Sequence, residues 1–144
     1  MRMRDFTLAM NFSGKMKTKT KSANHSSYQN ACKKIFMEQF RGQPCAVCGS
    51  RVGTAGHHVV SQARSKALKF DKRNIIVLCR GHHMTSNELA PHSSNQMAVT
   101  RFVEWFKANH AEQYAWIKEN EKIERKYNYR DALENLKAGR EAWE

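Results

Sequence analysis

Apolar residues recur at helical spacing in two parts of the chain, near its start and in its last third. In the first part, Phe36 and Phe40 share one helical face with other apolar residues and predict a short helix over residues 28–40. In the last third, two apolar stripes separated near Asn109 and a further segment over residues 130–143 predict a series of helices. Lysine or arginine alternates with glutamate on these segments, which is typical of solvated helical supports.

Short runs rich in β-branched residues occupy the middle of the chain. Residues 57–60 follow a turn marked by two glycines, and residues 74–78 form a second run that ends at Cys79. A long basic loop joins the two runs, and Gly81 precedes the expected start of a helix. The order of strand, loop, strand and helix predicts a small α+β fold.

Residues 1–27 contain few large apolar residues. Four lysines of this segment alternate with methionine, threonine and serine: Lys15, Lys17, Lys19 and Lys21. Such alternation also occurs in edge strands, but no apolar face accompanies it here, which favours a flexible basic arm that stays disordered or folds on DNA. We therefore expect three parts: the arm over residues 1–27, a core over residues 28–92 and a helical extension over residues 93–144.

The chain has 144 residues and a formal net charge of +12. Residues 1–83 carry 16 basic and 3 acidic side chains, whereas residues 84–144 carry 9 basic and 10 acidic ones. A field of one sign attracts a polyanion such as nucleic acid or an anionic membrane. The sequence has no apolar run of membrane-spanning length and no secretory signal, so we expect no membrane partner and a cytoplasmic location, in a bacterial host cell if the source is phage or bacterial.

Two pairs of potential metal ligands are separated by thirty residues. They are Cys45 with Cys48 and Cys79 with His82. Because Zn²⁺ takes cysteine and histidine tetrahedrally, four such ligands would close a structural zinc site with no position left for water. The alternative is two unrelated thiol pairs in a reduced cytosol. Cys32 lies outside the spacing, and we expect it to be a buried apolar residue of the first helix.

A second group of polar residues lies between and beside these pairs: His57, His58, Asn74 and His83. Neighbouring residues on a helix point about 100° apart, so His82 and His83 do not easily serve one metal. Neighbours on a strand also project in different directions. We therefore expect two sites, with a second metal bound by one histidine of the 57–58 pair while the other acts on water. No role is expected for His25, His92 or His110.

The stretch CAVC…AGHHVV…NIIVLCRGHH resembles the HNH nuclease motif over residues 45–90. The basic loop and the helical extension are more weakly similar to phage recombination nucleases of the NinG/Rap and Ref types. The resemblance implies a small ββα-metal (His-Me finger) core, in which two strands and a helix are stapled by a Cys3His zinc site. The basic arm and the helical extension would flank this core.

The same resemblance implies a role for each matching residue. His58 is expected to be the general base, and Asn74 either holds that base by a hydrogen bond or orients the loop. His57 and His83 are expected to bind the catalytic cation, Mg²⁺ or Mn²⁺, with other divalent ions tolerated by imidazole ligands. The last zinc position is more often cysteine than histidine in the family. If His83 held the zinc in place of His82, the catalytic assignment would shift by one residue.

The expected function is a metal-dependent HNH endonuclease that nicks DNA with low sequence specificity, in phage DNA recombination or processing. The loop residues expected to contact the phosphate backbone, together with the arm lysines, are Arg64, Lys66, Lys69, Lys72 and Arg73. One alternative is a catalytically inactive zinc-knuckle DNA-binding accessory protein. An RNA-binding zinc protein is disfavoured because exposed aromatic-rich strands are missing from the sequence pattern. The sequence leaves monomer and homodimer open.

Overall fold

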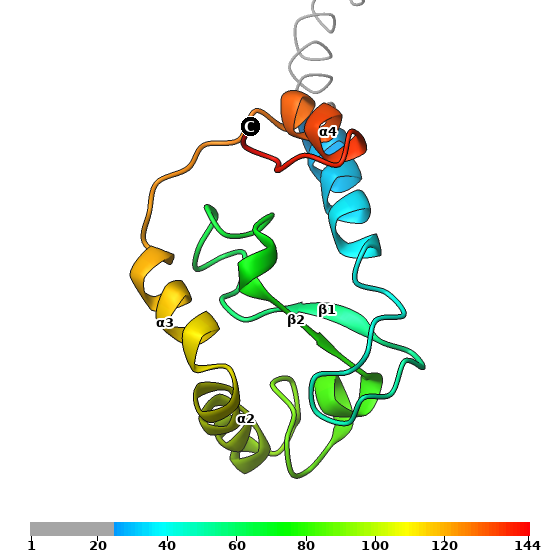
Figure 1. The fold of residues 1–144 in the computed structure, drawn as a ribbon, viewed down its shortest axis with the longest axis vertical. Helices are drawn as coiled ribbons and strands as arrows, with labels where there is room; N and C mark the ends of the chain where they lie inside the picture. The colour runs from blue at the N-terminus through cyan, green and yellow to red at the C-terminus, as the bar shows by residue number, and fades with distance from the viewer. Residues whose placement is uncertain (1–24) are drawn as a thin grey trace, which may run out of the picture.

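The computed structural model describes residues 25–144 (Figure 1). It confirms the expected α+β class, with two short strands and several helices. Residues 25–27, which we expected to end the arm, are already helical, whereas the four arm lysines lie outside the described residues. The elements in chain order are a helix over residues 25–38, β1 (Ala55–His58), the 3-10 turn η1 (Lys72–Asn74), β2 (Ile75–Leu78), the π-helical turn η2 (Gly81–Thr85), α2 (Gln96–Asn109), α3 (Ala111–Asn120) and α4 (Tyr129–Lys137).

β1 and β2 form a two-stranded antiparallel sheet in which His57 lies opposite Ile76 and His58 lies opposite Ile75. Since side chains alternate along a strand, each opposed pair shares one face of the sheet. Ile75 packs in one apolar cluster and Ile76 in another. The two adjacent histidines therefore project toward opposite faces, as expected from their neighbouring positions.

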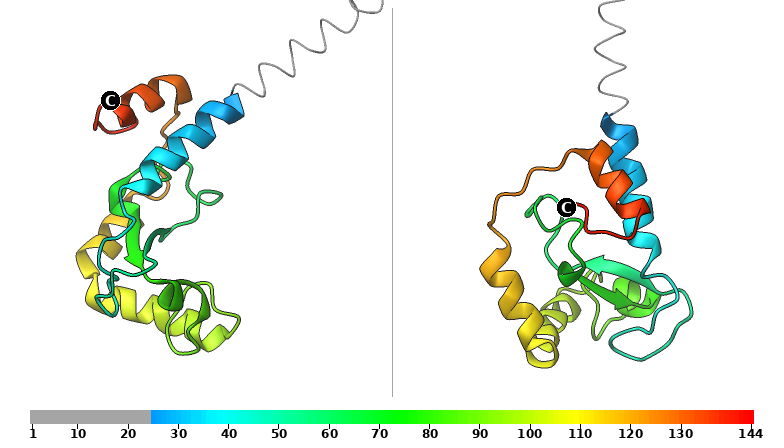
Figure 2. Two further views of the ribbon diagram at one scale, coloured as in Figure 1. Left: turned by 90° about the vertical axis from the view of Figure 1, so that its right-hand side faces the viewer. Right: turned by 45° about the horizontal axis from the view of Figure 1, so that its top comes forward.

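Helices cover both faces of this hairpin (Figures 1 and 2). The helix over residues 25–38 lies beside α4, and residues such as Phe36 and Leu133 form the first apolar cluster with Ile75. On the other face, Phe102 and Phe106 of α2 pack with Ile76, Leu78 and Ile117 of α3 in the second cluster. Both clusters combine residues of the expected core with residues of the expected extension, so the C-terminal helices are part of what holds the hairpin.

The close packing of the first helix on β1 depends on Gly56. A Cβ atom at this position would lie 2.9 Å from the Cγ2 of Ile75, 3.0 Å from the Cε of Met37 and 3.0 Å from a ring carbon of Phe40. Contacts this short force a shift of the backbone or of a buried ring. Glycine thus lets the helix come close to the strand that carries both histidines.

Two predicted helices are shorter than expected. The helix expected after Gly81 is a single turn, which ends with a hydrogen bond from the Ser86 amide to the Gly81 carbonyl. α4 ends at Lys137 rather than near residue 143, because Gly139 takes a positive φ of 77° and the Arg140 amide bonds back to Asn135. No helix among residues 25–144 combines the length and the apolar character that a membrane crossing requires.

Candidate functional site

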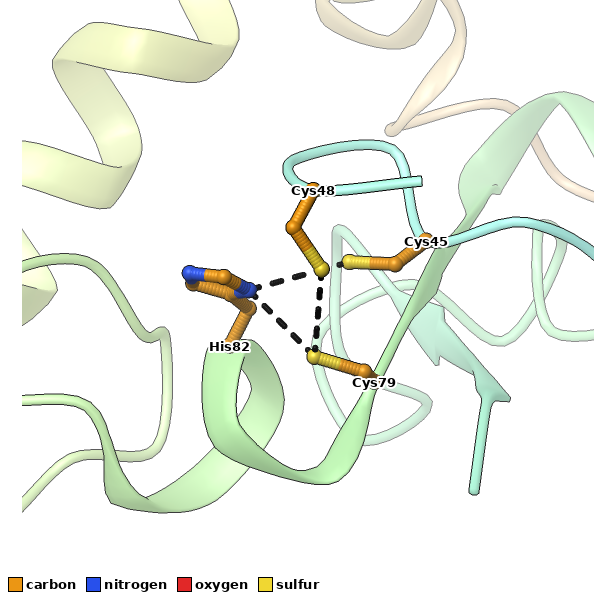
Figure 3. Close-up of side chains that lie close together, drawn as sticks. All are labelled: Cys45, Cys48, Cys79 and His82. Atoms are coloured by element: carbon orange, nitrogen blue, oxygen red, sulfur yellow. Dashed lines mark hydrogen bonds between the residues drawn. The ribbon is translucent and has the colours of Figure 1, made fainter. Parts of the chain in front are cut away.

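The four predicted zinc ligands come together at the end of the hairpin (Figure 3). Cys45 and Cys48 lie on the loop before β1, Cys79 follows β2, and His82 projects from η2. Their ligand atoms all lie within 4.8 Å of one another. The Cys48 and Cys79 sulfurs are 3.8 Å apart, and the His82 Nδ1 lies 3.8 Å from the Cys45 sulfur and 3.3 Å from the Cys79 sulfur.

This donor set fits a tetrahedral Zn²⁺ ion. Bonds of 2.0–2.3 Å place two sulfurs about 3.8 Å apart and a sulfur and a nitrogen about 3.6 Å apart. Burial acts to raise the pKa of Cys45, but hydrogen bonds from backbone groups of Cys48, Cys79 and Val47 and from the Cys48 thiol together lower it to about 6. Against the lowering effect of a backbone hydrogen bond from Ser50, the pKa of Cys48 is raised instead, since its thiol is the partner that keeps its proton beside the Cys45 sulfur. A lowered pKa favours the thiolate that binds metal. Cys32 lies apart in the first apolar cluster, as expected, and its thiol donates to the Tyr129 carbonyl.

A second cluster consists of three imidazoles, those of His57, His83 and His92. The His57 Nδ1 and the His83 Nε2 are 3.2 Å apart, and each pair of ring centres is separated by 4.9–5.0 Å. Two nitrogens bound to one cation at 2.0–2.1 Å lie about 3.0–3.4 Å apart, so the spacing fits a shared divalent ion. His82 and His83 thus belong to different clusters, and the one-residue shift of the catalytic assignment does not occur.

His92 is a candidate ligand to which the sequence analysis assigned no role. It follows Pro91 in the segment between η2 and α2, and its amide donates to the His83 carbonyl at 3.1 Å. This backbone hydrogen bond folds the segment back onto η2 and brings the third ring to the other two. His92 continues no periodic pattern and no ligand-pair spacing, so only its proximity in the folded chain identifies it.

The surroundings of His57 and His83 favour the uncharged form of both rings. Burial, followed by the neighbouring charges of His83, His92 and His58, lowers the pKa of His57 to about 3. Burial and the charge of His92 also lower the pKa of His83. Neutral imidazole is the form that binds metal. With three candidate ligands instead of four, the cluster leaves a coordination position for water or a phosphate oxygen, and its members range from buried His57 to exposed His92.

His58 is held by its backbone surroundings rather than by the three-histidine cluster. Its Nε2 donates to the Lys69 carbonyl at 2.8 Å, so a neutral ring keeps Nδ1 as its acceptor. Burial lowers the pKa of His58; the Lys69 hydrogen bond opposes this shift and the charge of Lys33 adds to it. The ring is therefore neutral near pH 7, with one fixed donor and one acceptor.

Asn74 organises the loop between the strands. It is fully buried, its side-chain oxygen accepts from the Val60 amide at 2.8 Å, and its amide group donates to the carbonyls of Val60 and Leu68. Its hydrogen bonds within residues 25–144 go to the loop backbone and not to the His58 ring. Of the two roles considered for Asn74, orientation of the loop is the one that these contacts support.

Residues from the segment between α3 and α4, and Tyr129 at the start of α4, hold the loop whose Lys69 carbonyl accepts the hydrogen bond from His58. The Tyr127 hydroxyl donates to the Ala67 carbonyl at 2.6 Å, and Arg125 donates to the same carbonyl at 3.1 Å. Lys69 is 4% exposed, its ammonium donates to the Tyr129 hydroxyl, and it lies 4.4 Å from the centre of that ring. The expectation that Lys69 contacts DNA is therefore wrong: its side chain is an internal anchor.

The other predicted DNA-binding residues of the loop differ in how far their side chains are held by contacts within the protein. Arg73 forms a double hydrogen bond with Asp71 and stacks on Trp116, which gives it a structural role, although half of its side chain is exposed. Arg64 is exposed and pairs with Glu121 at 3.4 Å. Lys66 and Lys72 are exposed and take part in no ion pair within the described residues.

A shallow groove adds two basic residues that the sequence analysis did not consider. The groove, of about 540 Å³, lies where the loop at Lys66 meets residues 121–126, and Lys122 and Lys126 line it on the other side. Both lysines are exposed. Glu121 and Glu124 line the same side of the groove together with Arg125, so the C-terminal half contributes three cations and two carboxylates next to the basic loop.

Comparison of the chain with family models, with curated proteins and with solved structures gives no match in any of the three. The geometry of the two clusters and of His58 therefore carries the functional argument. Both clusters take one member from η2, His82 in the first and His83 in the second, and complete their sets with residues on and around the hairpin.

Proposed function

We propose that this protein is a metal-dependent endonuclease of the HNH type, with a ββα-metal core stapled by zinc, that hydrolyses DNA phosphodiester bonds. The observation that carries the proposal is the pair of adjacent histidines on β1. His57 joins an open cluster of three imidazoles, and His58 is fixed through Nε2 with its Nδ1 left as an acceptor. A binding protein has no need of both features.

His58 would act as the general base. A neutral imidazole accepts a proton efficiently near pH 7, and the hydrogen bond to Lys69 fixes the ring so that Nδ1 is the accepting atom. The proton of the attacking water passes to Nδ1 while the water oxygen forms a bond to phosphorus and the bond from phosphorus to the 3′ oxygen breaks. The products are a 5′-phosphate and a 3′-hydroxyl, whose departing oxygen takes its proton from water. Asn74 and the clamped loop keep the Lys69 carbonyl in place, so they are positioning residues.

His57, His83 and His92 would hold the catalytic cation, Mg²⁺ or Mn²⁺. When bound, such an ion supplies positive charge that stabilises the scissile phosphate and the departing oxygen. Imidazole ligands suit transition metals better than Mg²⁺, so of these two ions the donor set favours Mn²⁺, and it also tolerates Ni²⁺ or Co²⁺. The cysteine cluster would hold Zn²⁺ in a purely structural role, because its four protein ligands leave no open position.

The exposed lysines around the basic loop would bind the DNA backbone. Lys66, Lys122 and Lys126 line one groove, and Lys72 is exposed on η1. Contacts of this kind hold the backbone without reading bases, which supports low sequence specificity. A nuclease of this kind fits phage DNA recombination or processing, the setting of the nucleases that the sequence resembles.

The test is a cleavage assay on plasmid and branched DNA with Mn²⁺ or Mg²⁺, comparing wild type with His58→Ala. We expect a loss of about 10²- to 10⁴-fold in rate, as for removal of a general base, with zinc content unchanged. His25→Ala is the matched control, because His25 is exposed and outside both clusters. Equal rates for His58→Ala and wild type would refute the assignment. DNA binding without any cleavage by wild type would favour the inactive accessory protein.

A further inference from the structure

A pocket of about 480 Å³ opens beside the three-histidine cluster. His57, His58 and His92 line it on one side, and residues of α2 and α3 line it on the other. Its floor is apolar and aromatic, formed by residues that are at most 4% exposed: Phe102, Phe106 and Ile117. The volume lies within the range of about 300–1,000 Å³ that is usual for pockets that take small organic groups.

Cationic side chains surround the mouth of this pocket. Arg64, Lys107 and Lys118 line it, and their side chains are 66%, 43% and 48% exposed. Glu121 lies 3.4 Å from Arg64 and 3.6 Å from Lys118 and holds these two cations near each other. Glu104, which does not line the pocket, lies 4.0 Å from Lys107. Three cations against these two carboxylates leave a small positive excess at the mouth above an apolar floor.

This combination suits one part of a DNA chain. Paired DNA presents phosphates, sugars and base edges to a protein, while the flat apolar faces of its bases stay hidden in the stack. An apolar floor next to cations instead matches a base that has left the stack, with its flanking phosphates at the mouth. Phe102, Phe106 and Tyr114 provide aromatic surface in the pocket wall.

We propose that this pocket binds an unpaired nucleobase of DNA. Its link to cleavage rests on the proposed nuclease function: the phosphodiester next to the bound base would lie at the histidine cluster that lines the same pocket. The preferred substrate is then DNA with an unpaired nucleotide beside the cut, such as a bulge, a branch point or a single-stranded end. Because the floor is apolar, the pocket selects for an unpaired base and not for one particular base.

The test blocks the pocket without disturbing the core. Val103 lines the pocket and is 44% exposed, so Val103→Trp adds a bulky ring there at little cost to folding. Val52→Trp is the matched control, because Val52 is 84% exposed and does not line the pocket. The probes are labelled duplexes of one sequence: fully paired, with one unpaired deoxyadenosine, and with one abasic nucleotide at the same position. Affinity is measured by fluorescence anisotropy without added Mg²⁺ or Mn²⁺, and cleavage with Mn²⁺.

We expect wild type and Val52→Trp to bind the unpaired deoxyadenosine duplex about tenfold more tightly than the other two probes. Val103→Trp should lose this preference and keep its affinity for paired DNA. Equal affinity of wild type for all three probes would overturn the proposal, as would an unchanged preference in Val103→Trp. If wild type shows the preference but cuts none of the probes, the nuclease function fails and the binding site stands. If it cuts all three equally and binds them equally, the nuclease function stands and the pocket proposal fails.

Discussion

The cysteine cluster and the histidine cluster share neighbouring residues but differ in the number and the chemical type of their candidate ligands. The cysteine cluster has four candidate ligands, enough to complete a tetrahedral zinc site, whereas the histidine cluster has three and leaves a coordination position free. Each cluster has one exposed member, Cys48 in the first and His92 in the second. η2 supplies one ligand to each, His82 to the first and His83 to the second. A single helical turn therefore joins the two candidate metal sites.

Because of this difference, we expect the cysteine cluster to stabilise the fold and the histidine cluster to support the reaction. A closed four-ligand site contributes its binding energy to the fold, because the unfolded chain has no preformed site. An open site has room for water or a phosphate oxygen and contributes less to stability. The two clusters should therefore respond oppositely to the loss of one ligand: the fold depends on the first, and activity on the second.

The largest difference between the two clusters should appear when one candidate ligand is removed from each. Cys79→Ser should abolish cooperative unfolding, because a structural zinc ion contributes about 10 kcal/mol or more and a whole domain is stable by only 5–15 kcal/mol. His83→Ala, four residues away, should remain folded with one zinc ion per chain. Circular dichroism during heating and metal analysis measure both outcomes. A folded Cys79→Ser protein without zinc would show that the cysteine cluster is not the staple.

Asn74→Ala tests how much hydrogen bonds outside the two clusters contribute to the free energy of unfolding. Asn74→Ala leaves every candidate ligand in place but removes the buried hydrogen bonds to Val60 and Leu68. We expect a loss of about 2–4 kcal/mol in the free energy of unfolding, since buried backbone groups of the loop lose their partner. Urea unfolding of the zinc-loaded protein measures this loss. A change below 1 kcal/mol would mean that the loop finds water or another partner.

The sequence predicts the parts of the site that depend on local spacing. The two ligand pairs, the presence of two strands and the division between His82 and His83 all follow from residue spacing and side-chain direction. The first strand covers Ala55–His58 instead of residues 57–60, so Gly56, which we expected in the turn, lies within it. The positions of Lys69 and His92 do not follow from spacing. Lys69 is buried because tyrosines about 60 residues later close over it, and His92 joins the cluster because its backbone bonds to His83. Both depend on contacts between distant or irregular segments, which periodicity does not encode.

His92→Ala tests whether the exposed member of the histidine cluster contributes to metal binding. Removing one of three imidazoles should weaken binding of Mn²⁺ by at least about tenfold, since even the loss of an outer partner of a metal ligand costs 10- to 100-fold. The melting temperature of the zinc-loaded protein should stay the same, because His92 is exposed. Isothermal titration with Mn²⁺ measures the affinity, and His110→Ala is a control outside the cluster. Unchanged Mn²⁺ affinity would remove His92 from the site.

The smallest expected effect comes from the clamp on the loop that holds His58. Burial raises the pKa of Tyr127, so its hydroxyl stays a donor to the Ala67 carbonyl at neutral pH. Tyr127→Phe removes that bond alone, and because Arg125 still donates to the same carbonyl, the cost should be about 1 kcal/mol. Tyr28→Phe, at an exposed tyrosine of the first helix, should cost nothing.

Tyr127→Phe should affect DNA cleavage and zinc content differently. Its zinc content should equal that of wild type, because Tyr127 touches no ligand of the cysteine cluster. Its DNA cleavage should fall by a few fold, because the Lys69 carbonyl that fixes the His58 ring belongs to the loosened loop. A drop in cleavage with unchanged zinc would show that the C-terminal segment positions the base. A loss of zinc with the same substitution would instead mean that both clusters depend on one cooperative scaffold, and that the division between a structural and a chemical site does not hold.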